Sequence, residues 1–250
     1  MDAARVKYPD LEFTFTQNLG FHSKLIDITV QRIEEALKED APAPASFAQH
    51  PIEKESFRII GEEMDSSRFT PLELPIVKRV IHSTADFEFK DIIRFSKGAI
   101  DAGMAAIKAG KNIVTDVRMV ESGIMKYRLA PYGVKTYCFS SDDDVAEAAE
   151  RGNITKTAAS MRKAAAYMEG GIVAIGNAPT ALAELLRIIR DGAPRPALII
   201  GVPVGFVGAK EAKDELIKSG LAFIASEGRK GGSTVAVAIV NALAIEAAAK

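Results

Sequence analysis

Histidine is the side chain best suited to moving a proton near neutral pH, because its ordinary titration falls between pH 5 and 8. The chain of 250 residues has three histidines, His22, His50 and His82, which are far apart in the sequence. They form no H-x-x-x-H pair and there is no cysteine pair, so we expect no protein-held metal. His82 ends an apolar, helix-like run in "VIHSTADFEF" and shares a helical face with Lys78 and Arg79. It is either a proton carrier or a histidine with a structural or surface role.

A second group of polar and glycine residues follows short apolar runs in the second half of the chain. They stand in "DVRMVESG" (Asp116, Arg118), "GNAPT" (Asn177, Thr180), "PVGFVGA" (Gly205, Gly208) and "EGRKGGS" (Arg229, Lys230). Ligands of open parallel sheets bind outside the carboxyl ends of the strands, where glycines and helix-opening N–H groups accommodate anions. The pattern predicts a site for an anionic ligand. The alternative is that tight turns after strands need Gly, Asn and Pro for conformational reasons alone.

The sequence motifs of the common nucleotide and hydrolase sites are missing. No G-x-G-x-x-G follows a strand, "GRKGGST" lacks the spacing of a phosphate-binding loop, and there is no G-x-S-x-G. We therefore expect no NAD, no ATP and no other cofactor. The net charge of −1 favours neither a nucleic acid nor a membrane surface as partner, so we expect a small molecule.

The elements that must position these residues alternate between strand and helix. Apolar runs without polar alternation predict strands at "NIVTDV", "KTYCF", "GIVAIG", "ALIIGVPV" and "AFIAS". Helices are predicted over 51–67, 69–83 and 93–110, the second with two competing starts, a Thr70–Glu73 capping box or Pro75 at the first turn. The alternation predicts an α/β, Rossmann-like three-layer fold, with helices on both faces of a mostly parallel sheet.

The first 50 residues are expected to form an N-terminal extension, distinct from a core domain over 51–250. "SKLIDITVQRIEEALKED" predicts a helix and "APAPASFAQHP" a linker. No apolar signal core or run of membrane-spanning length is present, and the single cysteine, Cys138, has no partner in the chain. We expect a cytoplasmic protein.

The sequence resembles one family over residues 51–250, the precorrin-8X (cobalt-precorrin-8) methylmutases of cobalamin biosynthesis. The resemblance lies in "SFRII", "RVIHSTAD", "VTDVRMVESGI", "AIGNAPTAL", "IIGVPVGFVGAKEAKDEL" and "GRKGGSTVAVAIVNAL". It implies an isomerase that moves a methyl group from C-11 to C-12 of a tetrapyrrole and gives hydrogenobyrinate or cobyrinate. No cofactor and no external methyl donor would be needed.

The resemblance also implies roles for individual residues. The family's catalytic histidine falls on His82, which would donate a proton to the macrocycle and recover it. The substrate-contacting serine falls on Ser56, and Lys156 stands where relatives carry arginine, so its charge is kept and the two-pronged fork is lost. From the residues alone, Ser56 could equally be a helix N-cap and Lys156 a solvated charge.

Three further residues, Asn177, Thr180 and Arg229, are expected to contact the substrate from the edge of the sheet; the alternatives are helix capping for Asn177 and a solvated charge for Arg229. By analogy with the family we expect a homodimer with active sites near the subunit interface. The alternative functions are a non-catalytic corrinoid carrier and an unrelated small-anion enzyme on a Rossmann-like sheet.

Overall fold

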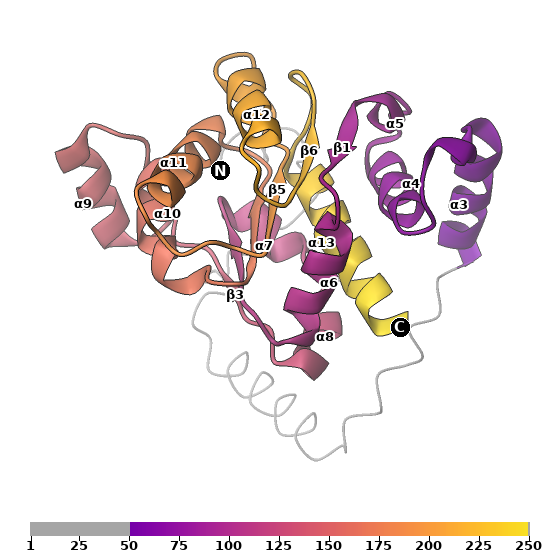
Figure 1. The fold of residues 1–250 in the computed structure, drawn as a ribbon, viewed down its shortest axis with the longest axis horizontal. Helices are drawn as coiled ribbons and strands as arrows, with labels where there is room; N and C mark the ends of the chain where they lie inside the picture. The colour runs from indigo at the N-terminus through magenta and orange to yellow at the C-terminus, as the bar shows by residue number, and fades with distance from the viewer. Residues whose placement is uncertain (1–50, 250) are drawn as a thin grey trace, which may run out of the picture. The chain divides into compact units, whose positions relative to one another are not determined.

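A six-stranded sheet forms the centre of the domain in the computed structural model, which describes residues 51–249 (Figure 1). The helix and linker expected in the first 50 residues lie outside the described residues. The strands are β1 (Ile93–Phe95), β2 (Ile113–Thr115), β3 (Thr136–Tyr137), β4 (Ile172–Ile175), β5 (Leu198–Gly201) and β6 (Phe223–Ser226), in the spatial order β1-β6-β5-β4-β2-β3. Neighbouring strands are parallel except β1, which pairs antiparallel with β6. The expected α/β fold with a mostly parallel sheet is confirmed.

Helices cover both faces of the sheet, and alternate strand residues enter two separate cores. On one face Ile113, Ile172 and Ile200 pack with residues of α4 (Glu73–Thr84), α6 (Ala99–Lys108) and α13 (Ser233–Ala249). On the other face Val114 and Val173 pack with α9 (Asp143–Gly152), α10 (Lys156–Ala164), α11 (Pro179–Arg190) and α12 (Ala209–Lys218). Burial on both faces explains why the strands read as continuous apolar runs. The remaining helices are α3 (Pro51–Glu63) and the short α5 (Phe89–Ile92), α7 (Arg118–Gly123) and α8 (Lys126–Leu129).

Two predicted helices have different bounds in the structure. The first ends at Glu63 rather than at residue 67, because the chain turns there into a short 3-10 segment, Ser66–Arg68. The second has the capping box that its sequence allows: the Thr70 N–H donates to the Glu73 carboxylate (2.9 Å), and the Glu73 N–H donates to Thr70 Oγ1 (3.3 Å). The helix itself begins at Glu73 with Leu72 as its N-cap, so these contacts form and Pro75 also lies in the first turn.

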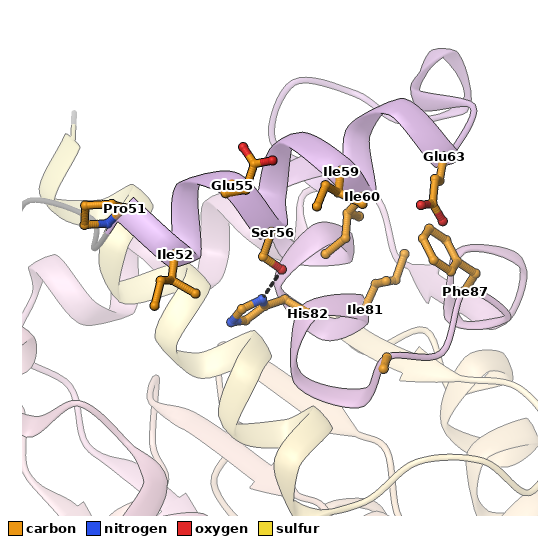
Figure 2. Close-up of a pocket in the computed structure, with 11 residues that line it drawn as sticks. Pro51, Ile52, Glu55, Ser56, Ile59, Ile60, Glu63, Ile81, His82 and Phe87 are labelled. Atoms are coloured by element: carbon orange, nitrogen blue, oxygen red, sulfur yellow. Dashed lines mark hydrogen bonds between the residues drawn. The ribbon is translucent and has the colours of Figure 1, made fainter.

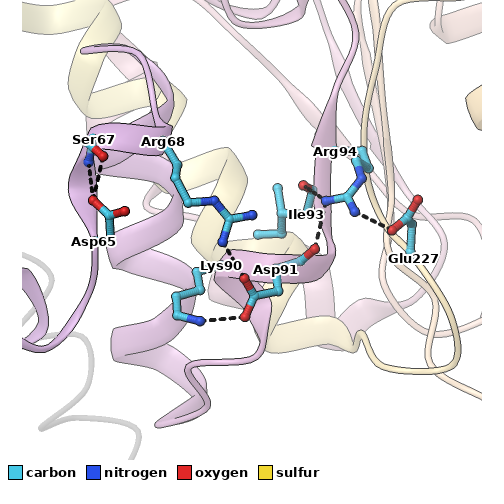
Figure 3. Close-up of polar contacts among 8 residues, drawn as sticks. All are labelled: Asp65, Ser67, Arg68, Lys90, Asp91, Ile93, Arg94 and Glu227. Atoms are coloured by element: carbon cyan, nitrogen blue, oxygen red, sulfur yellow. Dashed lines mark hydrogen bonds and ion pairs between the residues drawn. The ribbon is translucent and has the colours of Figure 1, made fainter.

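The prediction of a single helix over 93–110 is wrong at its beginning, where "IRF" forms β1. Figure 3 shows how this edge strand is fixed: Arg94 donates to the carbonyls of Asp91 and Ile93, and pairs with Glu227 beside β6 at 2.5 Å. Asp91 in turn accepts from Arg68 (2.6 Å) and Lys90 (2.5 Å). These ion pairs and the pairing with β6 override the helical pattern of the sequence.

The last helix, α13, is apolar on every side and packs against α4, α6 and α7. Its buried Asn241 is fully used: Oδ1 accepts from the Met125 N–H (2.8 Å) and Nδ2 donates to the Gly123 carbonyl (3.1 Å). The α7–α8 turn is thereby fixed to the core. No helix among residues 51–249 is both long and apolar enough to cross a bilayer.

The strand order reverses between β2 and β4. From β2 the chain continues to β3 on one side and then returns to β4 on the other. Such a switch point opens a crevice at the carboxyl ends of the strands, where α/β proteins commonly bind ligands. The residues that follow β2, β4, β5 and β6 therefore meet at one edge of the sheet.

Candidate active site

Ser56 and His82 form a hydrogen-bonded pair between two helices. His82 lies exposed in the last turn of α4, and its Nδ1 is 2.7 Å from Ser56 Oγ (Figure 2). Ser56 lies in the middle of α3 and not at its N-terminus. The N-cap interpretation of Ser56 is therefore wrong. The second ring nitrogen of His82 points away from Ser56 (Figure 2), so one nitrogen is held by the protein and the other is available to a ligand.

Two hollows meet at His82. The larger, of about 620 Å³, runs along α3 and has mainly apolar walls. Its walls are Pro51, Ile52, Glu55, Ser56, Ile59, Ile60, Glu63, Ile81, His82, Ala85 and Phe87. The other, of about 470 Å³, lies between α4, α7 and α13 and includes Met119, Ser233 and Thr234. Because Met119 follows β2 and Ser233 follows β6, the second hollow connects His82 with the carboxyl edge of the sheet.

A second layer of contacts from α3 supports the same turn of α4. The rings of Phe57 and His82 are stacked, with their centroids 5.2 Å apart and an interplanar angle of 23°. The Arg79 guanidinium lies 5.1 Å from the Phe57 centroid and pairs with Glu53 at 2.9 Å. Sequence analysis identified Arg79 only as a neighbour of His82 and missed Phe57; the available signal was its position directly after Ser56.

Asp116 fills the crevice at the switch point. Its buried carboxylate accepts hydrogen bonds from the backbone N–H groups of Gly176 (3.1 Å), Asn177 (2.8 Å) and Ala178 (2.8 Å). Burial raises the pKa of Asp116, and the three amide donors oppose that shift. The expectation that the N–H groups of "GNAPT" would bind an external anion is therefore wrong, since an internal carboxylate uses them. Asn177, whose N–H is one of these donors, has an exposed side chain.

Lys156 and Thr180 lie at two neighbouring helix N-termini. Lys156 is the exposed first residue of α10, directly after the N-cap Thr155, whose Oγ1 accepts from the Ala158 N–H. Thr155 Oγ1 is 2.8 Å from Thr180 Oγ1 on α11, and Thr157 Oγ1 is 3.2 Å from it. The three hydroxyls bring the α10 terminus with Lys156 next to Thr180. Lys156 is exposed there, and its ammonium is a donor of the kind that pairs with carboxylates.

Arg229 and Lys230, on the loop after β6, have different surroundings. The exposed Arg229 guanidinium lies 5.4 Å from the Phe206 ring, which is 84% exposed. Lys230 pairs with Asp86 (2.6 Å) and Glu88 (2.8 Å), so the pKa of Lys230 is raised and that of Asp86 is lowered. Lys230 is thus engaged in holding the loop against the end of α4, whereas Arg229 faces solvent.

A buried lysine on α12 also holds the loop after β6. Lys213 on α12 donates to the Lys230 carbonyl at 2.8 Å and to Ser226 Oγ at 3.3 Å, and Ser226 also donates to that carbonyl at 2.8 Å. Burial lowers the pKa of Lys213 to about 8. Sequence analysis missed this residue, because a lysine inside an amphipathic helix usually faces solvent.

These contacts place the six predicted site residues. Ser56 and His82 are brought together, as are Thr180 and the helix terminus with Lys156, while Asn177 and Arg229 stand on separate loops of the carboxyl edge. An imidazole with one nitrogen held and the other facing a hollow is suited to general acid–base chemistry. Within residues 51–249 no group of three or more His, Cys, Asp or Glu side chains is placed to hold a metal ion.

Known proteins match the described part of the chain closely. The cobalt-precorrin-8 methylmutase of Priestia megaterium is 50% identical over 202 residues, which is 81% of this chain and 90% of that protein. The cobalt-precorrin-8 methylmutase of Leptospira interrogans is 48% identical over 200 residues, 77% of this chain and 91% of that protein. The crystal structure of the precorrin-8X methylmutase from Thermus thermophilus superimposes with a TM-score of 0.74 at 45% identity, covering 79% of this chain and 96% of that one.

The family model of the precorrin-8X methylmutases matches residues 51–246, the whole of the sheet and its helices. Together with relatives at up to 50% identity, this match shows that the chain belongs to the precorrin-8X methylmutase family.

Proposed function

We propose that the protein moves a methyl group from C-11 to C-12 of precorrin-8X or cobalt-precorrin-8 and yields hydrogenobyrinate or cobyrinate, with His82 as the acid–base residue. As a member of its family the chain is an isomerase of cobalamin biosynthesis. The observation that supports the role of His82 is its 2.7 Å hydrogen bond to Ser56 at the junction of two hollows. Cobalt, where present, belongs to the substrate.

The Ser56 hydroxyl lets one imidazole both give and take a proton without turning. When Nδ1 carries a proton and donates it to Ser56 Oγ, the second nitrogen, Nε2, can hold a proton toward the hollow. After Nε2 passes that proton to the macrocycle, the imidazolium becomes a neutral imidazole with Nδ1–H still bonded to Ser56. The Nε2 lone pair then faces the substrate and takes the proton back after the methyl shift. General acid help of this kind gives about 10²–10⁴ in rate.

The remaining task is to hold a flat substrate that bears several carboxylate side chains. The apolar wall of the larger hollow, with Ile59 and Phe87, suits the face of the ring. We assign the carboxylates to Lys156, Asn177, Thr180 and Arg229, which offer charge-assisted or neutral donors at the edge of the sheet. Fixing the migrating methyl against the neighbouring carbon is an orientation effect, which preformed sites supply well.

We also propose that the protein is a cytoplasmic homodimer. The proposal of a second subunit is supported by large apolar side chains exposed near His82, Ile59 at 40% and Met119 at 70%. The cytoplasmic location is supported by the single cysteine, Cys138, which is buried and free.

Turnover of purified protein with precorrin-8X and with cobalt-precorrin-8, followed by absorption spectroscopy, tests the function. His82→Ala should lower kcat by about 10²–10⁴ and still bind the product, and Ser56→Ala should lower kcat less. Ser219→Ala is the matched control, because this hydroxyl at the end of α12 donates to the Leu216 carbonyl, accepts from the Leu221 N–H and lies outside both hollows. Near-wild-type turnover of His82→Ala would refute the acid–base role. Binding of both substrates without conversion by the wild-type protein would identify a corrinoid carrier instead.

A further inference from the structure

The exposed imidazole of His82 depends on few contacts for its orientation. Ser56 holds Nδ1 at 2.7 Å, but a single hydrogen bond leaves the ring some rotation about its Cβ–Cγ bond. Stacking on Phe57, at 5.2 Å between centroids and 23° between planes, restricts that rotation, because aromatic pairs have preferred geometries. The two contacts together define both the direction of the ring and its plane.

The spacing of the residues matches the two facing helices. Glu53, Ser56 and Phe57 stand at positions i, i+3 and i+4 of α3, so they share one face, and Arg79 and His82 stand one turn apart on α4. Each α3 residue touches one or both of the α4 residues. The interface between the two helices is therefore built around the histidine.

Phe57 is itself held by a partly buried ion pair. The Arg79 guanidinium lies 5.1 Å from the Phe57 centroid, within the range of cation–π attraction. Arg79 and Glu53 are paired at 2.9 Å, with side chains only 15% and 26% exposed. The ion pair fixes the guanidinium, and the guanidinium restricts the Phe57 ring.

Phe57 lines neither of the two hollows that meet at His82, so a ligand in them would not touch it. We propose that Phe57, held by the Arg79–Glu53 pair, is a positioning residue that fixes the plane of the His82 ring and so directs Nε2 to the substrate. This inference rests on the proposed function of His82. It predicts that loss of the aromatic ring lowers kcat and leaves KM unchanged.

Steady-state turnover of Phe57→Leu and Phe57→Tyr tests the inference. Stacking energies of this kind correspond to about a two- to tenfold effect. Phe57→Leu should therefore lower kcat by about three- to tenfold with KM within about twofold of wild type, whereas Phe57→Tyr, which keeps the ring, should retain kcat. Arg79 and Glu53 also line the second hollow, so the substitutions are confined to Phe57. Lys54→Met, at an exposed residue of α3 that lines neither hollow, is the control for general damage to the helix.

A measurement on the resting protein separates this inference from the proposed function. With ¹⁵N-labelled histidine, the widths of the ring resonances of His82 report whether the ring keeps one orientation, because exchange between orientations broadens them. Wild type and Phe57→Tyr should show one narrow set of resonances, and Phe57→Leu should show broadened ones. Unchanged resonances and unchanged kcat in Phe57→Leu, or equal losses of kcat in the Leu and Tyr variants, would overturn the positioning role. An inactive wild-type protein with the expected resonances would overturn the function alone.

Discussion

The buried amine of Lys213 should make the stability of the domain rise with pH above 8. Its side chain is fully buried, and its pKa falls to about 8 because burial disfavours the ammonium form. In the unfolded chain a lysine titrates near about 10.4. Between these two values the unfolded state therefore binds more protons than the folded state, and the free energy of unfolding increases as the pH rises.

The size of the effect follows from the difference between the two pKa values. Below pH 8 both states carry the proton and the contribution is close to zero. By pH 10 the folded amine is neutral while most of the unfolded amine is still charged, which adds about 2.5 kcal/mol to the free energy of unfolding. This is a large fraction of the stability of an ordinary domain, about 5–15 kcal/mol.

Lys213→Met removes the amine and nearly preserves the volume, and the Lys230 carbonyl keeps its bond from Ser226. Urea unfolding of both proteins from pH 7.5 to pH 10 should show the wild type gaining about 2.5 kcal/mol relative to the variant. The other titrating groups cancel in this difference. Lys210→Met, an exposed residue of the same helix that pairs with Asp214, is the control and should show no such gain. Parallel curves for wild type and Lys213→Met would refute the reasoning.

Three further changes test the edge of the sheet. Asp116→Asn places an amide among three backbone donors and should lower the free energy of unfolding by about 2–4 kcal/mol in urea titrations. An unchanged urea midpoint would show that these three hydrogen bonds do not stabilise the domain. Lys156→Glu should raise the Kd for the corrinoid product by about tenfold, measured by absorption titration. The same charge reversal at Lys135 should leave the Kd unchanged. Equal Kd values for Lys156→Glu and wild type would show that Lys156 does not contact the ligand. Gly176→Ala puts a Cβ 2.8 Å from Cα of Ser233 and should cost about 1–3 kcal/mol in thermal unfolding; wild-type stability would mean that α13 shifts without strain.

The sequence predicted best the strands that are buried on both faces of the sheet. Strands β4 and β5 are buried on both faces, so their apolar runs alone identified them. The edge strand β1 was missed because only three residues pair and its partner β6 lies about 130 positions away. Pairings between distant segments are not visible in local periodicity.

For the site, the chemistry of single residues was predictable but their partners were not. His82 stands out by its residue type, whereas its bond to Ser56 was not predicted: the family resemblance implied Ser56 only as a substrate contact, and the two residues lie on different helices. The N–H groups after β4 looked available in the sequence; only the fold shows that Asp116 from another strand has already used them. Contacts between elements, rather than the elements themselves, were the unpredictable part.

The carboxylate of Asp116 has a consequence for how this scaffold can be altered. In doubly wound sheets the backbone N–H groups at the switch point commonly bind a phosphate group. Here the Asp116 carboxylate accepts hydrogen bonds from those N–H groups instead. His82, bonded to Ser56, lies instead on the paired helices α3 and α4. Substitutions in that helical pair should therefore leave the buried hydrogen bonds of the switch point intact.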